Sequence, residues 1–289
     1  MAIRLVPALA QGLQSSPSGH VAVLVSWQTL VEALRVHQSE TGLVQKSAPG
    51  AGAIRRALQE QIAHGLLPAM ERLPSERQLS ELFATTRITL REALLQLEAL
   101  GLIYREERRG WFVAPPRLAY NPLARTHFHA MVEAQGRRPA TEVLAARQLL
   151  ASAEVCRLLE LPALSSVYQI RRVRRIDGRL VLYVEHYLNA AYFPGLLEHD
   201  LRRSLTELYR DRYDIRYGEV RFEILPTALL PEAAQALRVA QGSPALHITR
   251  INHDQQGRLI DCDLEFWRHD AIQVRVEVPS GGGSALLAR

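Results

Sequence analysis

The stretch "LPSERQLSELFATTRITLR", residues 73–91, decides the fold of the first part of this chain. It places two polar clusters, Ser-Glu-Arg and Thr-Thr-Arg-Ile-Thr, in front of short apolar patterns with helical spacing. Ser75 followed three residues later by Gln78 is a capping box, which predicts a helix from Glu76. Thr86 is a suitable cap for another helix, reached after a short turn. We therefore expect a helix-turn-helix here.

The flanking residues complete a small domain. Upstream, apolar residues with helical spacing predict a helix from Ala53 that Gly65 ends. Downstream, residues 102–116, "LIYREERRGWFVAPP", have the pattern strand, charged turn, strand. The apolar stripe of the helix between them consists of Leu90, Ala93, Leu94, Leu97 and Leu100. The order of elements predicts a winged helix-turn-helix domain over residues 51–116.

The polar side of this third helix is a candidate DNA-binding surface. Arg87 and Arg91 are four residues apart and therefore share one side, opposite the leucine stripe. Guanidinium groups, hydroxyls and the positive end of a helix dipole suit phosphates and guanine edges in a major groove. The alternative is an ordinary solvated basic face, which any one of these residues alone would favour. Their joint placement favours DNA binding, with these candidate residues: Arg77, Thr86, Arg87, Thr89, Arg91, Arg109 and Gly110.

Composition sets limits on the rest of the chain. The 289 residues are 47% hydrophobic and carry a net charge of +5, which permits a polyanionic partner. No apolar run approaches the roughly 18 residues that span a membrane, so we expect a cytoplasmic protein. Cys156 and Cys262 form no metal or disulfide framework, and we expect no metal and no cofactor. Residues 1–50 have the composition of a poorly ordered extension, and residues 280–289 that of a disordered tail.

A second domain is expected over residues 127–279, after a linker at residues 117–126. Its patterns predict an α+β fold with a mainly antiparallel sheet and flanking helices. Asp177-Gly178 is a hairpin signal between two of the strands. Strands are predicted at 141–151, 166–176, 179–188, 215–229, 245–254, 259–269 and 271–278, and helices at 152–161, 201–213 and 231–240.

Two of these strands carry unusual charge. In residues 166–176, Arg172 and Arg174 share a face with Tyr168 and Ile170. If that face points inward, the two arginines need a buried anion, and if it points outward they form a solvated basic ladder. In residues 259–269, acidic side chains alternate with apolar ones, so one face is either plain solvent surface or the mouth of a ligand site.

Both domains resemble known families. The motif "LPSERQLSELFATTRITLREALLQLEALGLI…RRGWFV" resembles the DNA-binding region of GntR-type transcriptional regulators over residues 53–114. The resemblance implies DNA contact by the candidate residues of the helices and by the wing tip at Gly110. Residues 127–278 resemble the UTRA effector-binding domain of the HutC-like branch, which is related in fold to chorismate lyase.

The second resemblance also implies an effector site. Its residues would be Arg172, Arg174, Glu185, Ser204, Glu223 and Trp267, with Asp263 added by its place on the acidic strand. The stretches "DCDLEFWRHDAI" and "RRGWFVAPPRLAYNP" are similar to the phosphonate-utilisation branch, whose proposed effector is 2-aminoethylphosphonate. A phosphosugar is the competing effector, because its hydroxyls would also use the acidic acceptors.

The expected function is therefore a ligand-responsive regulator that binds a palindromic double-stranded DNA operator as a homodimer. The alternative is a lyase-like enzyme built on the second domain. That domain contains several histidines, but none has metal-ligand spacing, a partnered nucleophile or a glycine-rich phosphate loop beside it. We expect no catalytic residues.

Overall fold

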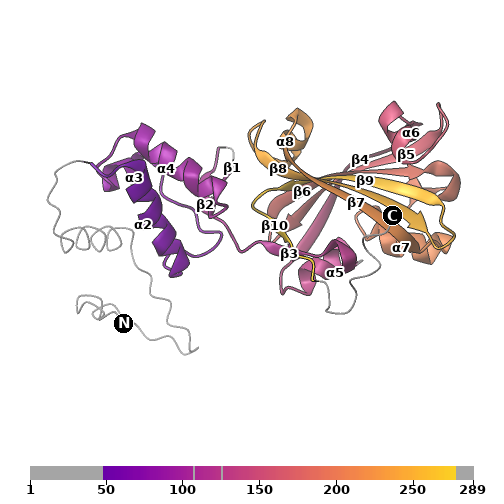
Figure 1. The fold of residues 1–289 in the computed structure, drawn as a ribbon, viewed down its shortest axis with the longest axis horizontal. Helices are drawn as coiled ribbons and strands as arrows, with labels where there is room; N and C mark the ends of the chain where they lie inside the picture. The colour runs from indigo at the N-terminus through magenta and orange to yellow at the C-terminus, as the bar shows by residue number, and fades with distance from the viewer. Residues whose placement is uncertain (1–47, 107, 125, 278–289) are drawn as a thin grey trace. The chain divides into compact units, whose positions relative to one another are not determined.

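The computed structural model describes residues 48–106, 108–124 and 126–277 (Figure 1). The described residues form two compact units that divide between Ala99 and Leu100. The expected extension at residues 1–50, apart from residues 48–50, and the expected tail at residues 280–289 lie outside the described residues.

The first unit contains α2 (Ala51–Ala63), α3 (Glu76–Leu82) and α4 (Arg87–Ala99). The predicted capping box is confirmed, because Ser75 Oγ accepts a hydrogen bond from the Gln78 N–H and Gln78 Oε1 accepts one from the Ser75 N–H. At the start of α4, Thr86 Oγ1 accepts from the Thr89 N–H at 3.2 Å. The polar clusters of the opening stretch therefore satisfy the free amides at two helix starts.

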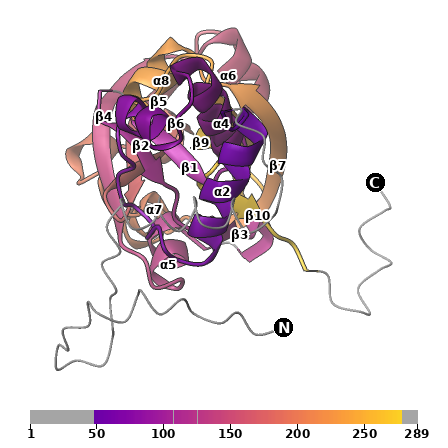
Figure 2. The ribbon, with the colours of Figure 1, turned by 90° about the vertical axis from the view of Figure 1, so that its left-hand side faces the viewer.

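The core of this unit lies between helices α2 and α4, which run side by side in both ribbon views (Figures 1 and 2). Leu90, Ala93, Leu94 and Leu97 are buried, as the stripe predicts. Leu100 is 46% exposed, so its assignment to the stripe is wrong. The reason is that α4 ends at Ala99, one residue before Leu100.

The predicted hairpin is also present and belongs to the second unit. Strands β1 (Ile103–Glu106) and β2 (Gly110–Val113) pair antiparallel, and the rings of Tyr104 and Phe112 stack with centroids 5.5 Å apart. Gly110 has a φ of 97°, a backbone conformation that favours glycine.

A six-stranded sheet forms the centre of the second unit. Its spatial order is β4-β5-β6-β9-β8-β7, and every neighbouring pair is antiparallel. The predicted α+β fold with a mainly antiparallel sheet is confirmed. The strands are β4 (Pro139–Leu150), β5 (Ser166–Ile176), β6 (Arg179–Asn189), β7 (Tyr217–Ala228), β8 (Pro244–Asp254) and β9 (Leu259–Arg268).

Helices cover both faces of this sheet (Figure 1). Helices α5 (Phe128–Glu133) and α7 (Leu205–Tyr213) pack on one face, which we call the cavity face. Helices α6 (Ala153–Leu158) and α8 (Pro231–Leu237) pack on the opposite face. Short 3-10 helices lie at Pro122–Ala124, Ala190–Tyr192 and Leu196–Glu198.

A small parallel pair joins the two ends of the second domain. Strand β3 (Leu118–Tyr120), inside the interval expected to be a linker, pairs with β10 (Ile272–Val274). Leu118 and Tyr120 are buried with Trp267, which explains why this short segment is ordered against the sheet. The strand predicted at residues 271–278 was therefore too long, since pairing is limited to the three residues of β10.

Candidate functional site

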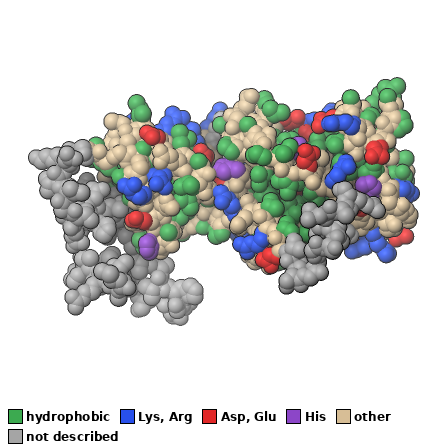
Figure 3. Space-filling model, in the orientation of Figure 1, with side chains coloured by type: hydrophobic (Ala, Val, Ile, Leu, Met, Phe, Trp, Pro, Cys, Tyr) green, Lys and Arg blue, Asp and Glu red, His purple; other side chains and the backbone are tan. Residues whose placement is uncertain are grey.

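The start of α4 presents an open basic surface. Arg87 and Arg91 are exposed, and within the described residues neither guanidinium has an ion-pair partner. Thr86 and Thr89 stand beside them with their hydroxyl oxygens 2.9 Å apart, and Ile88 between them is 83% exposed. Arg side chains lie over the helices of this unit on the face shown in Figure 3. This arrangement can bind phosphates and base edges.

The other two predicted DNA-contacting arginines have local partners. Arg77 pairs with Glu81 at 3.0 Å, but both side chains are more than half exposed, so the pair contributes little stability. Arg109 at the turn of the hairpin pairs with Glu106 and lies 5.2 Å over the ring of Phe112. The Arg109 side chain is 68% exposed, so a phosphate can reach its guanidinium despite the pair with Glu106.

A cavity lies on the cavity face of the sheet in the second unit. It encloses about 590 Å³ of space between atoms, part of it open to solvent. The sheet forms its floor, and α5, the residues before it and the start of α7 form its walls. The polar residues that define it are Arg172, Arg174, His186, Ser204, Arg250 and Glu265.

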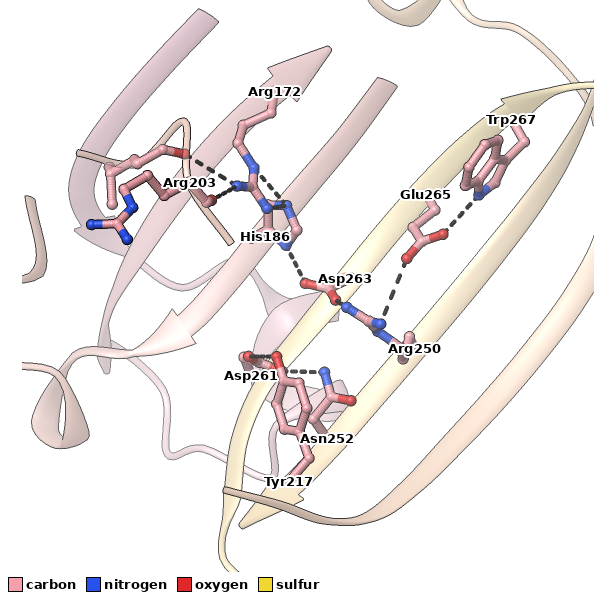
Figure 4. Close-up of polar contacts among 11 residues, drawn as sticks. Arg172, His186, Arg203, Tyr217, Arg250, Asn252, Asp261, Asp263, Glu265 and Trp267 are labelled. Carbon is pink, nitrogen blue, oxygen red and sulfur yellow. Dashed lines mark hydrogen bonds and ion pairs between the residues drawn. The ribbon is translucent and has the colours of Figure 1, made fainter. Parts of the chain in front are cut away.

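Arg172 is fully buried and held by the protein itself. Its Nη1 donates to the backbone carbonyls of Leu201 and Arg203, each at 3.1 Å. Its Nε and Nη2 approach His186 Nε2 at 3.1 and 2.7 Å (Figure 4). Arg172 therefore positions residues 201–203, which lead into Ser204. Its donors are used inside the protein and not kept for a bound anion.

His186 connects Arg172 to the acidic strand β9. Burial lowers the pKa of His186 to about 3, and the nearby guanidinium groups also lower it, so the imidazole is neutral. Because Nε2 accepts from Arg172, Nδ1 carries the proton and donates to Asp263. The second oxygen of Asp263 accepts from Arg250, whose Nε lies at 2.9 Å (Figure 4).

Asp263 remains ionised in this buried chain of contacts. Burial alone would raise its pKa, but the hydrogen bonds donated by His186 and Arg250 and the positive charge of Arg250 hold it well below the usual range. Burial alone would lower the pKa of Arg250, but the negative charges of Asp263 and, to a smaller extent, Glu265 raise it above its usual value. The Arg172–His186–Asp263–Arg250 chain thus spans four strands, β5, β6, β9 and β8, and Asp263 supplies its negative charge.

Glu265 forms the acidic part of the cavity. Its Oε2 accepts from Trp267 Nε1 at 2.7 Å, and its Oε1 lies 3.9 Å from Arg250 Nε. Burial raises the pKa of this carboxyl, and Arg250 offsets part of the rise. Glu265 can therefore accept a hydrogen bond from a ligand or balance a positive group.

Arg174 lines the cavity with part of its guanidinium group unpaired within the described part of the chain. It lies 4.7 Å over the ring of Phe128 in α5, and its buried Nε has no hydrogen-bond partner among the described residues. Burial lowers the pKa of Arg174 to about 9, and the neighbouring Arg172 contributes to the lowering. An anion in the cavity would stabilise its charged form.

Ser204 brings the start of α7 to the same cavity. Its Oγ accepts from the Glu207 N–H at 3.3 Å, as expected of the helix cap that the sequence predicts. The side chain is buried, and it lines the cavity together with Leu205 and Thr206. The free amides at the start of a nine-residue helix favour an anion at this point.

The structure brings together only part of the predicted effector set. Arg172, Arg174, Ser204 and Trp267 line the cavity, and Asp263 lies behind its wall. Glu185 and Glu223 lie in register with Leu264 and Thr249 on the opposite face. There Glu185 accepts from the hydroxyls of Tyr183 and Tyr187. Both glutamates therefore lie outside the cavity, because adjacent residues of a strand point to opposite faces.

Sequence reasoning missed His186 and Arg250, which are central to the cavity. Each stands among other polar residues of its strand, and nothing in the strand's own sequence distinguishes it from them. Strand register is the information that would have identified them. His186 in β6 and Arg250 in β8 both lie opposite Asp263, on either side of β9. Loop residues such as Thr126 and His127 gave no signal, since their approach depends on how α5 packs.

The described residues contain no cluster of three metal-ligating side chains, and they contain no helix that is long and apolar enough to cross a membrane.

Comparison with known proteins covers both units. Residues 50–113 match the gntR family of bacterial regulatory proteins, and residues 134–273 match the UTRA domain. The uncharacterized HTH-type transcriptional regulator YihL of Escherichia coli (strain K12) is 29% identical over 225 residues, covering 78% of this chain and 95% of that protein. The HTH-type transcriptional repressor NagR of Bacillus subtilis (strain 168) is 29% identical, covering 75% and 89%.

The fold also matches a solved structure. The crystal structure of PhnF from Mycobacterium smegmatis covers 78% of this chain and 99% of its own chain, with a TM-score of 0.56 and 24% identity. The named relatives are transcriptional regulators. The helix-turn-helix with its hairpin and the UTRA sheet with its cavity place this chain in the GntR family of bacterial regulatory proteins, in the HutC-like branch that carries a UTRA domain.

Proposed function

We propose that this regulator is a cytoplasmic homodimer that binds a palindromic operator and releases or holds it according to a small anionic effector. Arg174 is the observation that carries the proposal. It is a guanidinium with an unpartnered buried Nε, and it shares a cavity with the start of α7. A buried charge without a partner is costly, so an anionic ligand gains from binding there.

The effector that the sequence resemblance favours is 2-aminoethylphosphonate. Its phosphonate would lie between Arg174 and Ser204, and its ammonium group would pair with Glu265, whose carboxylate also lines the cavity. A phosphosugar is the competing effector, with its phosphate in the same place and its hydroxyls on the polar wall. Both ligands use the same anion site, so comparing them separates the identity of the effector from the existence of the site.

The anion site is tested by replacing Arg174. We expect Arg174→Ala to weaken binding of the effector by about 10- to 100-fold, the usual contribution of a hydrogen bond to a charged group. Thermal shift finds the ligand and calorimetry measures its affinity, because a ligand that binds only the folded state raises the melting temperature. Arg175→Ala is the matched control, since Arg175 lies one residue on and pairs with Glu142 outside the cavity.

Equal loss of affinity in Arg174→Ala and Arg175→Ala would contradict the proposed anion site. No response to 2-aminoethylphosphonate, together with a response to phosphosugars, would remove the first effector and keep the site.

The regulatory step follows from differential affinity. If the effector binds one arrangement of the dimer more tightly than another, it must shift the population that fits the operator. Sedimentation analysis should show a dimer, and the operator should consist of two half-sites related by symmetry. A monomer that binds a single half-site with full affinity would contradict the dimer.

A further inference from the structure

We propose that Asn252 forms a second part of the effector site and accepts a hydrogen bond from a neutral hydroxyl group at the non-anionic end of the effector. This inference rests on the proposed anion site at Arg174. It supports the competing effector class, the hydroxylated phosphate esters that include phosphosugars, over 2-aminoethylphosphonate, whose non-anionic end is an ammonium group.

A second cavity adjoins the first on the same face of the sheet. It encloses about 430 Å³ of space between atoms, part of it open to solvent. Tyr120, Thr126, His127, Thr206, Tyr217 and Arg250 line both cavities, so a single ligand can reach from one to the other. The second cavity adds Val220, Phe222 and Asn252.

Asn252 lines this second cavity, and within the described part of the chain its side-chain oxygen is an unused hydrogen-bond acceptor. Its side chain is 0% exposed, and its Nδ2 donates to Asp261 Oδ1, which fixes the orientation of the amide. Its Oδ1 is buried and has no hydrogen-bond partner among the described residues. Figure 4 shows that this oxygen points away from Asp261. A buried carbonyl without a donor is unfavourable, so a ligand that supplies the donor gains affinity.

The neighbouring groups favour a hydroxyl over an ammonium as that donor. None of the residues that line the second cavity is Asp or Glu, and Arg250 lines it. A positive group placed there would meet a like charge without a carboxylate on the wall. The hydroxyl of Tyr217 already donates to Asp261 at 3.1 Å, so the ligand must bring its own donor.

The walls also suit the carbon frame of a polyol. Val220 and Phe222 alternate toward the cavity face from strand β7 and supply apolar surface beside Asn252. Apolar walls with a small number of placed polar groups are usual for small-molecule sites. A ligand with an anionic head at Arg174 and a hydroxylated carbon chain toward Asn252 would fill both cavities.

The experiment measures the affinity of three probes by calorimetry: methyl phosphate, glycerol 3-phosphate and glucose 6-phosphate. In the wild type we expect at least one hydroxylated ester to bind about tenfold more tightly than methyl phosphate, as one buried hydrogen bond provides. In Asn252→Ala that advantage should disappear while the affinity for methyl phosphate stays within about twofold. Unchanged binding of methyl phosphate also shows that the variant is folded.

Asn121→Ala is the matched control. Asn121 lines the same cavity, but its Oδ1 already accepts from the Leu123 N–H at 2.9 Å, so its loss should leave the preference for hydroxylated esters intact. Hydroxylated esters that bind no more tightly than methyl phosphate, or a preference that survives in Asn252→Ala, would overturn the role of Asn252 and leave the anion site standing. Failure of all three probes to bind would overturn the anion site itself.

Discussion

At the scale of single residues, two arginines on one face of one strand have different roles. Arg172 is enclosed by His186 and two backbone carbonyls, whereas Arg174 keeps an unpartnered Nε in the cavity. Sequence alternation predicted that the two share a face. It could not predict which one the protein would use internally, because that depends on the segment at Leu201–Arg203 approaching the sheet.

This difference gives a stability prediction. Arg172→Ala should destabilise the second unit by about 3–5 kcal/mol, because it leaves His186 and two buried carbonyls without their donor. Arg174→Ala should cost much less, since it removes a charge that is partly desolvated and unpaired. Urea unfolding of both variants measures the difference, and equal destabilisation would contradict the assignment.

Asp261 gives a pH prediction. Burial, with help from Asp263, raises the pKa of Asp261 to about 7, above the ordinary value of 3.8. The folded state therefore holds a proton that the unfolded state loses, and stability from this group falls as pH rises from about 4 to about 7. Above pH 7 the buried Asp261 carboxylate is charged in the folded protein, whereas an asparagine at this position would be uncharged.

We therefore expect Asp261→Asn to raise the melting temperature by about 2–6 °C at pH 8 and to change it little at pH 5. The difference between variant and wild type isolates this group from the buried His186, whose lowered pKa acts in the opposite direction. A variant with the same advantage at both pH values would show that Asp261 is already ionised at pH 5.

At the scale of elements, the helix caps and periodic patterns were good predictors because they act within one helix or strand. The cap at Ser75, the helix at Ser152 and the hairpin at Asp177-Gly178 all depend on neighbouring residues, and the structure contains all three. Helix α5 and strand β3 were missed, since each is short and is stabilised by packing against the sheet.

The composition of the cavity could be predicted only in part for the same reason. Alternation assigns residues to faces within a strand, but the match between strands depends on register. Bulges near Val143, Arg174 and Asn252 shift that register. The residues around these bulges show no sequence pattern that would have predicted them. Glu185 and Glu223 were assigned to the site by the family resemblance, whereas alternation along their strands places both on the opposite face.

The cap of α3 gives a prediction at this scale. Ser75→Ala removes the acceptor for the Gln78 N–H and should destabilise the first unit by about 1 kcal/mol. Ser75→Asp keeps an acceptor at the same position and should remain close to the wild type. Thermal unfolding followed by circular dichroism compares the two, and equal loss in both would mean that the cap does not stabilise α3.

At the scale of the whole molecule, we expect the first unit to bind the operator and the second unit to bind the effector. Arg91→Ala should weaken operator binding and reduce the slope of log affinity against log salt concentration by about one, as expected when one phosphate contact is lost. Affinity for the effector should be unchanged, because the cavity lies entirely in the second unit. A loss of effector affinity in this variant would contradict the division.

The most direct test of the central claim follows operator binding by fluorescence anisotropy while effector is added to the wild type and to Arg174→Ala. We expect the effector to change the operator affinity of the wild type by about 5- to 150-fold, a typical allosteric coupling. Without effector, Arg174→Ala should bind the operator as the wild type does, and at the same effector concentrations its affinity should stay constant. An equal effector response in the two proteins would contradict a sensing site at Arg174.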